Sequence, residues 1–253
     1  NLLLNQRVFR FTFIIKILLK SLSHYTYKNC DFIRGVEEKY TKTLSGKYNK
    51  DFLTFPAWVD YTIYKSVENK REGIVYVGNI IPRKGVLFLI KNFHEYSKKF
   101  NLQEKFLIVG EIQNLDYFNE CSDYINKNNI DNIDFLDSQL PEDLSNIYSS
   151  SRLLLMASNY EGLPRVLIES GLCRTPSLAS NIQGIRDPFG KYGGTILYKL
   201  NDPKDFQEKL HYFLNHIDIQ KNLGEKAKTL SSKLSGKNRF TENWKKIAEK
   251  LYE

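Results

Sequence analysis

The chain has 253 residues, of which 42% are hydrophobic and 26% are charged, as is typical of a soluble globular protein. Its net charge of +8 is uneven, because residues 1–70 carry 12 Lys and Arg against 6 Asp and Glu. No aromatic-interleaved basic motif and no zinc-ligand spacing accompany this charge, so we expect no nucleic-acid partner. Three widely separated cysteines favour free thiols in a reducing compartment over a disulfide framework.

The first predicted element is a helix over about residues 8–20. This run is apolar but is interrupted by Arg10, Lys16 and Lys20, and it is shorter than the ~20 apolar residues that a membrane span needs. No small-residue cleavage site follows it, so it does not resemble a signal peptide. Two interpretations stay open: a helix packed on a core, and a basic helix lying at an anionic membrane surface.

Residues 23–70 are less regular. They predict a strand at 30–33, a helix at 34–45, a strand at 52–56 and a linker at about 60–71. This pattern indicates the end of one α/β unit, a remnant of a second Rossmann-like domain.

From residue 73 onward, short apolar strands alternate with helices. The predicted strands are 73–78, 105–110, 133–136, 152–157, 175–179 and 195–198, and the predicted helices are 86–99, 114–128, one from 141, 166–172, 203–215, 217–233 and 240–252. Strands this apolar between helices predict a parallel sheet covered on both faces, the doubly wound α/β class. Gly78, Gly110 and the 158–164 turn all follow strands, so we expect them to meet at the carboxyl edge of the sheet, where ligands bind in such folds.

The 158–164 turn leads into an apolar helix. Gly162, Leu163, Pro164 and Arg165 place backbone N–H groups at the start of that helix, an arrangement that favours an anion. Glu161 lies at the mouth of this site. An alternative interpretation makes Glu161 only a favourable helix-terminal charge.

Glu169 follows Val166, Leu167 and Ile168 within the same helix, so its carboxylate should be buried and should need a partner. Such a carboxylate can accept the two hydrogen bonds of a diol, such as the 2′ and 3′ hydroxyls of a ribose. The alternative is that Glu169 is a surface residue.

Arg83 and Lys84 stand between a predicted strand and the next helix, where two cations suit a diphosphate. The alternative is an ordinary basic loop. The dinucleotide fingerprint G-x-G-x-x-G is absent after the early strands, and the four histidines have no metal-binding or triad spacing. We therefore expect neither a nicotinamide cofactor nor a metal.

Together these segments resemble the retaining glycosyltransferases of family 4, which have the two-Rossmann-domain GT-B fold. The resemblance covers about residues 50–253. It rests on Val77-Gly78-Asn79-Ile80-Ile81-Pro82-Arg83-Lys84-Gly85, on Phe106-Leu107-Ile108-Val109-Gly110-Glu111, on the E-x7-E signature from Glu161 to Glu169, and on Phe55-Pro56-Ala57-Trp58-Val59-Asp60.

The resemblance implies roles for these residues. Glu161 would face the donor sugar, Glu169 would hold the ribose hydroxyls, and Lys84 would neutralise the diphosphate leaving group, so that Glu161 and Lys84 are the predicted catalytic pair. The N–H groups around Leu163 and Pro164 would meet the distal phosphate. The predicted donor-binding set is Gly78, Asn79, Arg83, Lys84, Gly110, Glu161, Gly162, Leu163, Pro164, Arg165 and Glu169.

Two positions depart from the family pattern. Asn79 stands where the family usually has Arg, and Arg83 is the candidate substitute. Leu136-Asp137-Ser138 stands where the family usually has Gly near the nucleobase, so the base cannot be assigned and UDP-, GDP- and ADP-sugars all remain candidates.

The resemblance also implies a domain division. Residues 1–66 would be the remnant of an acceptor-side domain with its linker, 67–236 the nucleotide-sugar domain, and 237–253 a helix returning toward the first domain. We expect a truncated chain, inactive by itself, whose parent transfers a hexose-type sugar with retention to a glycan or lipid-linked acceptor in polysaccharide biosynthesis. The expected location is the cytoplasm, with peripheral contact at the inner face of the plasma membrane. A non-catalytic nucleotide-sugar-binding module and a GT-B-type sugar-nucleotide epimerase are the alternatives.

Overall fold

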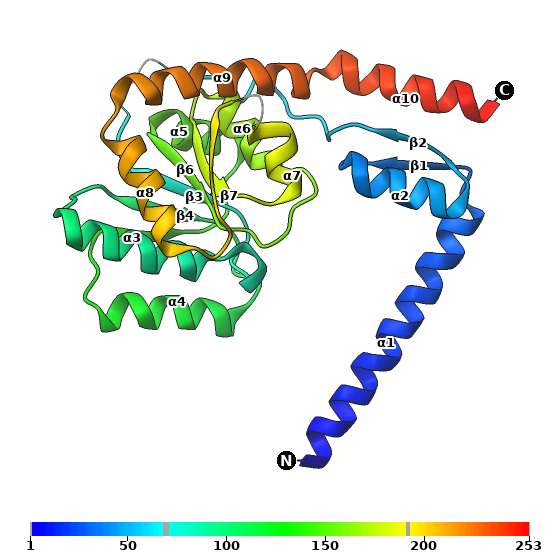
Figure 1. The fold of residues 1–253 in the computed structure, drawn as a ribbon, viewed down its shortest axis with the longest axis horizontal. Coiled ribbons are helices and arrows are strands. Elements are labelled where there is room, and N and C mark those ends of the chain that lie inside the picture. Colours follow the sequence, from blue (N-terminus) through cyan, green and yellow to red (C-terminus); the bar gives the residue numbers. More distant parts are fainter. Residues whose placement is uncertain (1, 68–70, 191–192, 253) are drawn as a thin grey trace. The chain divides into compact units, whose positions relative to one another are not determined.

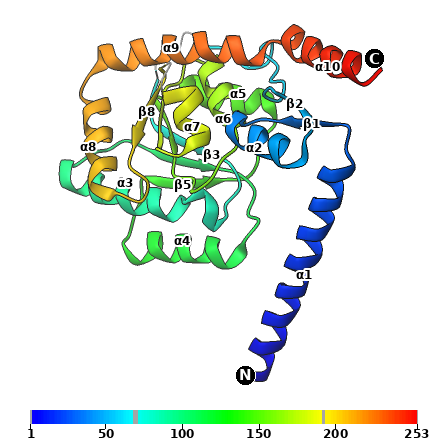
Figure 2. The same cartoon turned by 45° about the vertical axis from the view of Figure 1, so that its right-hand side comes forward.

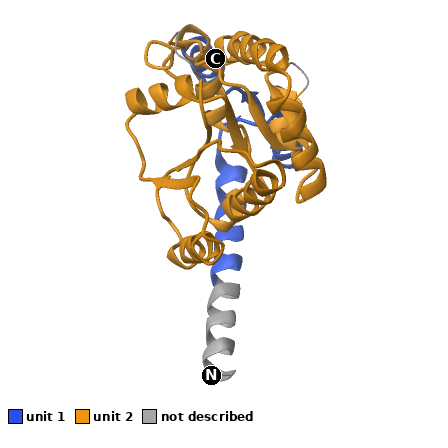
Figure 3. Cartoon of the chain, turned by 90° about the vertical axis from the view of Figure 1, so that its left-hand side faces the viewer, with its two compact units in different colours: residues 1–56, 241–253 blue, residues 57–240 orange. Residues whose placement is uncertain are grey.

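The computed structural model describes residues 2–67, 71–190 and 193–252, with side chains from residue 15 onward. The chain forms two compact units (Figure 3): residues 1–56 together with 241–253, and residues 57–240. The predicted divisions were at 66/67 and 236/237, whereas the units divide after residues 56 and 240.

The larger unit contains a six-stranded parallel sheet (Figure 1). Its strands are β3 (Ile74–Val77), β4 (Phe106–Val109), β5 (Ile133–Leu136), β6 (Leu153–Met156), β7 (Ser177–Ser180) and β8 (Thr195–Tyr198), in the spatial order β5-β4-β3-β6-β7-β8. Each predicted strand is present within two residues of its expected bounds. The predicted α/β class with a Rossmann-like parallel sheet is therefore confirmed.

Helices cover both faces of this sheet (Figures 1 and 2). Side chains alternate along each strand, so Ile74 and Tyr76 of β3 enter one apolar core and Val75 and Val77 enter the other. The first core is closed by α3 (Val86–Phe100), α4 (Leu115–Lys127) and α8 (Pro203–Leu214). The second is closed by α5 (Pro141–Ser150), α6 (Arg165–Leu172), the short α7 (Gln183–Ile185) and α9 (Ile217–Ser235).

The strand order places a topological switch point between β3 and β6. The chain adds β4 and β5 on one side of β3, then returns to place β6, β7 and β8 on the other side. The loops that leave β3 and β6 therefore diverge to opposite sides of the sheet, and a crevice for a ligand opens between such loops. The loops concerned are residues 78–85 and 157–164.

The smaller unit holds α1 (Leu2–Asn29), β1 (Phe32–Gly35), α2 (Glu38–Tyr48), β2 (Asp51–Thr54) and most of α10 (Lys237–Tyr252). Strands β1 and β2 pair in parallel. The guanidinium of Arg34 lies 4.6 Å from the ring centre of Phe55, and Trp244 contacts that ring edge-on. Within the described residues, no helix combines the length and the apolar character that crossing a membrane requires.

Several elements differ from the sequence-based expectation. The first helix extends over Leu2–Asn29 instead of 8–20, and the expected helix at 34–45 begins at Glu38 because the Glu37 carboxylate caps its first backbone N–H groups. Three short helical segments were not predicted: η1 (Pro82–Lys84), α7 and the η2 segment (Arg186–Gly190) that follows it. Segments this short have too few residues to show a hydrophobic period.

Candidate functional site

Three loops meet at the carboxyl edge of the sheet, as the sequence predicted. The N–H of Gly78 donates to the carbonyl of Val109, and residues 80 and 112 form a parallel bridge beyond the strands. Gly110 has φ +155°, and a Cβ there would overlap the carbonyl oxygen of Gly78. The N–H of Asn159 donates to the carbonyl of Arg83, at 2.9 Å, and so ties the loop after β6 to the loop after β3.

Lys84 and Glu161 form an ion pair across the switch point. The Lys84 Nζ lies 2.6 Å from Glu161 Oε1, and their side chains are 16% and 10% exposed. Arg83 adds a second cation, 3.5 Å from the same oxygen, and donates to the carbonyl of Tyr160 at 2.6 Å. Each of these contacts joins residues 77 or 78 positions apart in the sequence, so the strand order brings the two loops together.

Gly85 lets the chain turn from this pair into α3. Its φ is +68°, a left-handed conformation that costs other residues more than glycine, and a Cβ there would overlap the carbonyl oxygen of Ala157. The N–H of Gly85 closes the short η1 turn on Pro82. The close approach holds Lys84 beside the end of β6.

Asn79 belongs to a polar chain along the first two loops. Its side-chain N–H donates to Gln113 Oε1, Gln113 donates to Glu111 Oε2, and both distances are 2.8 Å. The hydroxyl of buried Tyr76 donates to the carbonyl of Asn79. Arg83, the predicted substitute cation, instead contacts the 160–161 turn.

Glu169 is buried in α6, as its apolar neighbours predicted, with only 6% of its surface exposed. The hydroxyl of Tyr148 donates to its Oε2 at 3.2 Å, and Arg165, one helical turn earlier, lies 3.5 Å from its Oε1. Burial raises the pKa of the Glu169 carboxyl, and the Arg165 charge and the Tyr148 hydrogen bond partly offset that rise. The alternative of a surface residue is therefore wrong.

The turn before α6 is supported from behind by α7. A Cβ on Gly184 would overlap the carbonyl oxygen of Glu161, so the α7 backbone packs directly against the turn. Gly162 and Leu163 are half-buried, Pro164 is buried at the N-cap position of α6, and Arg165 is exposed on its first turn. The chemical roles predicted for these residues remain predictions.

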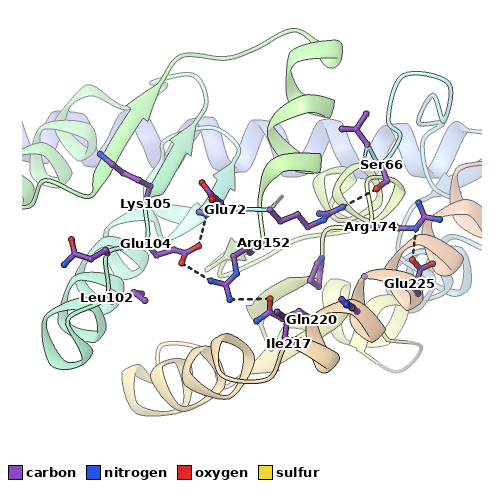
Figure 4. Close-up of a pocket in the computed structure, with 17 residues that line it drawn as sticks. Ser66, Glu72, Leu102, Glu104, Lys105, Arg152, Arg174, Ile217, Gln220 and Glu225 are labelled. Atoms are coloured by element: carbon purple, nitrogen blue, oxygen red, sulfur yellow. Dashed lines mark hydrogen bonds and ion pairs between the residues drawn. The ribbon is translucent and has the colours of Figure 1, made fainter. Parts of the chain in front are cut away.

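A large pocket lies at the opposite, amino edge of the sheet (Figure 4), with a volume of about 1330 Å³. Two ion pairs lie in its lining: Arg152 contacts Glu104 at 2.9 Å and Arg174 contacts Glu225 at 2.7 Å. Glu104 also accepts from the N–H of Gly73, just before β3. The Glu104 contacts join the segments that lead into β3, β4 and β6, and the Arg174–Glu225 pair joins the segment before β7 to α9.

No group of three or more potential metal ligands occurs within the described residues.

The sequence analysis missed three residues that shape this region: Tyr76, Gln113 and Tyr148. Tyr148 lies in a helix two elements before Glu169, and Gln113 lies in a loop without regular spacing. The two tyrosines matched the apolar pattern of core positions, so no local signal separated them from other buried aromatics.

A sequence model of the family described as "Glycosyl transferases group 1" matches residues 63–230, which include both sides of the switch point. The chain belongs to this family. The match covers the whole six-stranded sheet, so the group 1 glycosyltransferase domain accounts for most of the larger unit.

Curated proteins similar to this group 1 glycosyltransferase domain are also named as glycosyltransferases. It is 27% identical over 162 residues to the uncharacterized glycosyltransferase MJ1178 of Methanocaldococcus jannaschii, covering 64% of this chain and 43% of that protein. It is 25% identical to the capsular polysaccharide biosynthesis glycosyltransferase CapM of Staphylococcus aureus, covering 65% of this chain and 42% of CapM.

A third relative is a Campylobacter jejuni α-1,4-N-acetyl-D-galactosaminyltransferase named for a glycan on a diphospho-undecaprenol. The identity is 26%, over 82% of this chain and 57% of that protein. The chain thus spans about half the length of these relatives.

Among solved structures, HepE of Anabaena in complex with UDP-glucose matches with a TM-score of 0.78 at 14% identity, over 92% of this chain and 67% of that one. At this identity the likeness shows the fold, which is that of GT-B glycosyltransferases.

Proposed function

We propose that this chain carries the donor site of a retaining family 4 glycosyltransferase, which moves a hexose-type sugar from a nucleoside diphosphate to a glycan or lipid-linked acceptor. The observation that carries the proposal is the Lys84–Glu161 pair, placed by β3 and β6 at the switch point of a group 1 glycosyltransferase domain. Ligands of open α/β sheets bind at this position.

Transfer breaks the bond between the sugar C1 and the β-phosphate oxygen, and the bonding electrons stay on the diphosphate. A new bond forms from C1 to an acceptor hydroxyl oxygen, whose proton is released to water. Negative charge therefore develops on the diphosphate, and fixed cations in a partly water-excluded site stabilise that charge most effectively. Lys84 supplies such a cation and Arg83 a second, more exposed one.

Glu161 has a defined role before the donor arrives. Its carboxylate neutralises Lys84 at 2.6 Å, so that the largely buried ammonium is not left without a counter-charge. A bound diphosphate would share this cation, and Glu161 would then face the donor sugar. The remaining predicted donor contacts are Gly78, Asn79 and Gly110 on the first two loops and Gly162 to Arg165 at α6.

The names of the relatives support the substrate class. CapM is named for capsular polysaccharide biosynthesis, the Campylobacter enzyme for a lipid-linked glycan, and HepE was solved with UDP-glucose. We propose a polysaccharide or lipid-linked glycan product for the parent enzyme, made in the cytoplasm at the inner face of the plasma membrane. We further propose that the chain by itself binds donor without completing transfer, because it spans only about half of those relatives.

Calorimetric titration with UDP, GDP and ADP tests the donor site. We expect one of the three to bind saturably, and Lys84→Ala to weaken its affinity by at least about tenfold, since a charge-assisted contact to phosphate is lost. The matched control is Lys105→Ala, which removes a lysine from the pocket at the opposite edge and should leave the affinity unchanged.

Two results would count against the proposal. Absence of binding by a chain whose circular dichroism shows it to be folded would remove the donor assignment. An equal loss of affinity in Lys84→Ala and Lys105→Ala would show a general charge effect instead of a site at the switch point.

A further inference from the structure

The two carboxylate oxygens of Glu169 have different surroundings. Oε2 accepts the hydrogen bond from Tyr148, which is completely buried, whereas Oε1 lies beside Arg165, whose side chain is 57% exposed. One oxygen therefore faces the core and the other faces the outer side of α6. A carboxylate without the core contact could rotate about its terminal torsion, which is broad for glutamate.

Tyr148 is itself held firmly. It lies in α5 within the second apolar core, its ring centre is 6.2 Å from that of Tyr64, and its carbonyl accepts a hydrogen bond from the Thr175 hydroxyl at 2.5 Å. Its buried hydroxyl donates to Oε2 of Glu169. Since an unsatisfied buried hydroxyl is costly, this geometry favours a single orientation of the Glu169 carboxylate.

We propose that Tyr148 is a positioning residue for ribose recognition: it holds Oε2 of Glu169 and thereby presents Oε1 to a ribose hydroxyl of the donor nucleotide. This inference rests on the proposed donor site and deepens it. The Arg165 side chain would move away from Oε1 when the nucleotide binds, since its contact with Oε1 is long and its side chain is mostly exposed.

A purely structural hydrogen bond would behave differently from a positioning one. Its loss would lower the stability of the fold without regard to the ligand. Loss of a positioning contact lowers the affinity for nucleotides that have both ribose hydroxyls, and leaves the affinity for a nucleotide without the recognised hydroxyl nearly unchanged.

The experiment is calorimetric titration of the wild-type chain and Tyr148→Phe with UDP, GDP and ADP, followed by the 2′-deoxy and 3′-deoxy forms of the nucleotide that binds. We expect Tyr148→Phe to bind the ribonucleotide about tenfold more weakly, as for loss of a hydrogen bond to a charged group. For one of the two deoxy forms, the affinity of Tyr148→Phe should differ from that of the wild type by less than about twofold. The hydroxyl that this form lacks is the one bound at Oε1.

A double-mutant cycle with Glu169→Gln separates the two residues. In the Glu169→Gln background, Tyr148→Phe should cause no further loss of ribonucleotide affinity. Tyr96→Phe is the matched control: it deletes another buried hydroxyl, bound to His211 at 3.0 Å in the other core, and should leave every affinity unchanged.

The pH profile gives a further readout. The charged and titratable groups facing Glu169 are Arg165, Tyr64 and Tyr148. Without the Tyr148 hydrogen bond the pKa of the Glu169 carboxyl is higher. As the pH is lowered, ribonucleotide affinity should therefore begin to fall at a higher pH in Tyr148→Phe than in the wild type.

The outcomes are distinct. Equal weakening of ribonucleotide and both deoxy forms would overturn the positioning role and leave the donor site standing. No binding of any nucleotide by the folded wild-type chain would overturn both.

Discussion

At the scale of single residues, the burial of Glu169 opposes its ionisation. Its pKa is raised mainly because the carboxylate is removed from water, and the nearby Arg165 and Tyr148 offset only part of that rise. In the window between the unfolded pKa of 4.5 and the raised folded pKa, the folded chain binds more protons than the unfolded chain. The free energy of unfolding therefore falls as the pH rises through this window.

Glu169→Gln should remove this cost. We expect the variant to be at least as stable as the wild type at pH 8 in urea unfolding, and its advantage to shrink as the pH is lowered through the window toward 4.5. The same variant should lose ribonucleotide affinity, as expected where function maintains a destabilising group. A variant that is less stable at pH 8 by an amount independent of pH would show that the ionised carboxylate stabilises the fold.

At the scale of elements, the junction between η1 and α3 depends on Gly85. Its left-handed φ and the overlap that a Cβ would make with the Ala157 carbonyl both penalise a side chain. We expect Gly85→Ala to lower the free energy of unfolding by about 2–4 kcal/mol, the sum of the left-handed strain and of local overpacking. Nucleotide affinity should fall as well, because Lys84 would move relative to β6.

Gly46 offers a control of opposite sign. It lies inside α2, and a Cβ there would meet no atom within 4 Å. Gly46→Ala should raise the stability of its helix by about 0.5–1 kcal/mol, measured by amide hydrogen exchange of α2. If Gly85→Ala left the free energy of unfolding unchanged or raised it, the close approach of Gly85 to the Ala157 carbonyl would be contradicted.

At the scale of the whole molecule, the positive charge is concentrated in the first 70 residues. In α1, Lys16 and Lys20 lie among exposed apolar side chains, which are Ile15, Ile17, Leu18, Leu19 and Leu22. This combination suits the surface of an anionic bilayer. We expect the chain to co-sediment with vesicles containing phosphatidylserine. Charge reversal by Lys16→Glu with Lys20→Glu should lower its affinity for these vesicles by at least about tenfold.

Charge reversal at Lys245 and Lys246 of α10 is the matched control, because it makes the same change in net charge on another exposed helix of the same unit. Binding that falls equally in both double variants would reflect net charge alone. Binding to neutral and anionic vesicles alike would show that the apolar residues act without the lysines.

The local pattern of the sequence was enough to predict the six strands and the burial of Glu169. Both depend on neighbours within a few residues: two apolar strands end just before Gly78 and Gly110, and most neighbours of Glu169 in its helix are apolar. The local pattern could not predict the polar contacts between distant segments. Tyr148 occupies an ordinary apolar core position in the sequence pattern, and Gln113 occurs in a loop without periodicity. The spacing of residues therefore does not indicate their hydrogen bonds to Glu169 and Asn79.

What the chain's sequence decided is the type and order of its elements, because hydrophobic period, glycine and proline act over a few residues. What the tertiary structure decided is which elements became neighbours. Strand β3 pairs with β6, and the paired residues are 79 positions apart in the sequence. This pairing is possible because β4 and β5 lie on the other side of β3 and leave its second edge open for β6. That pairing brings Lys84 to Glu161 and creates the switch point, since contacts between residues so far apart follow from the packing of the whole sheet and from no local pattern.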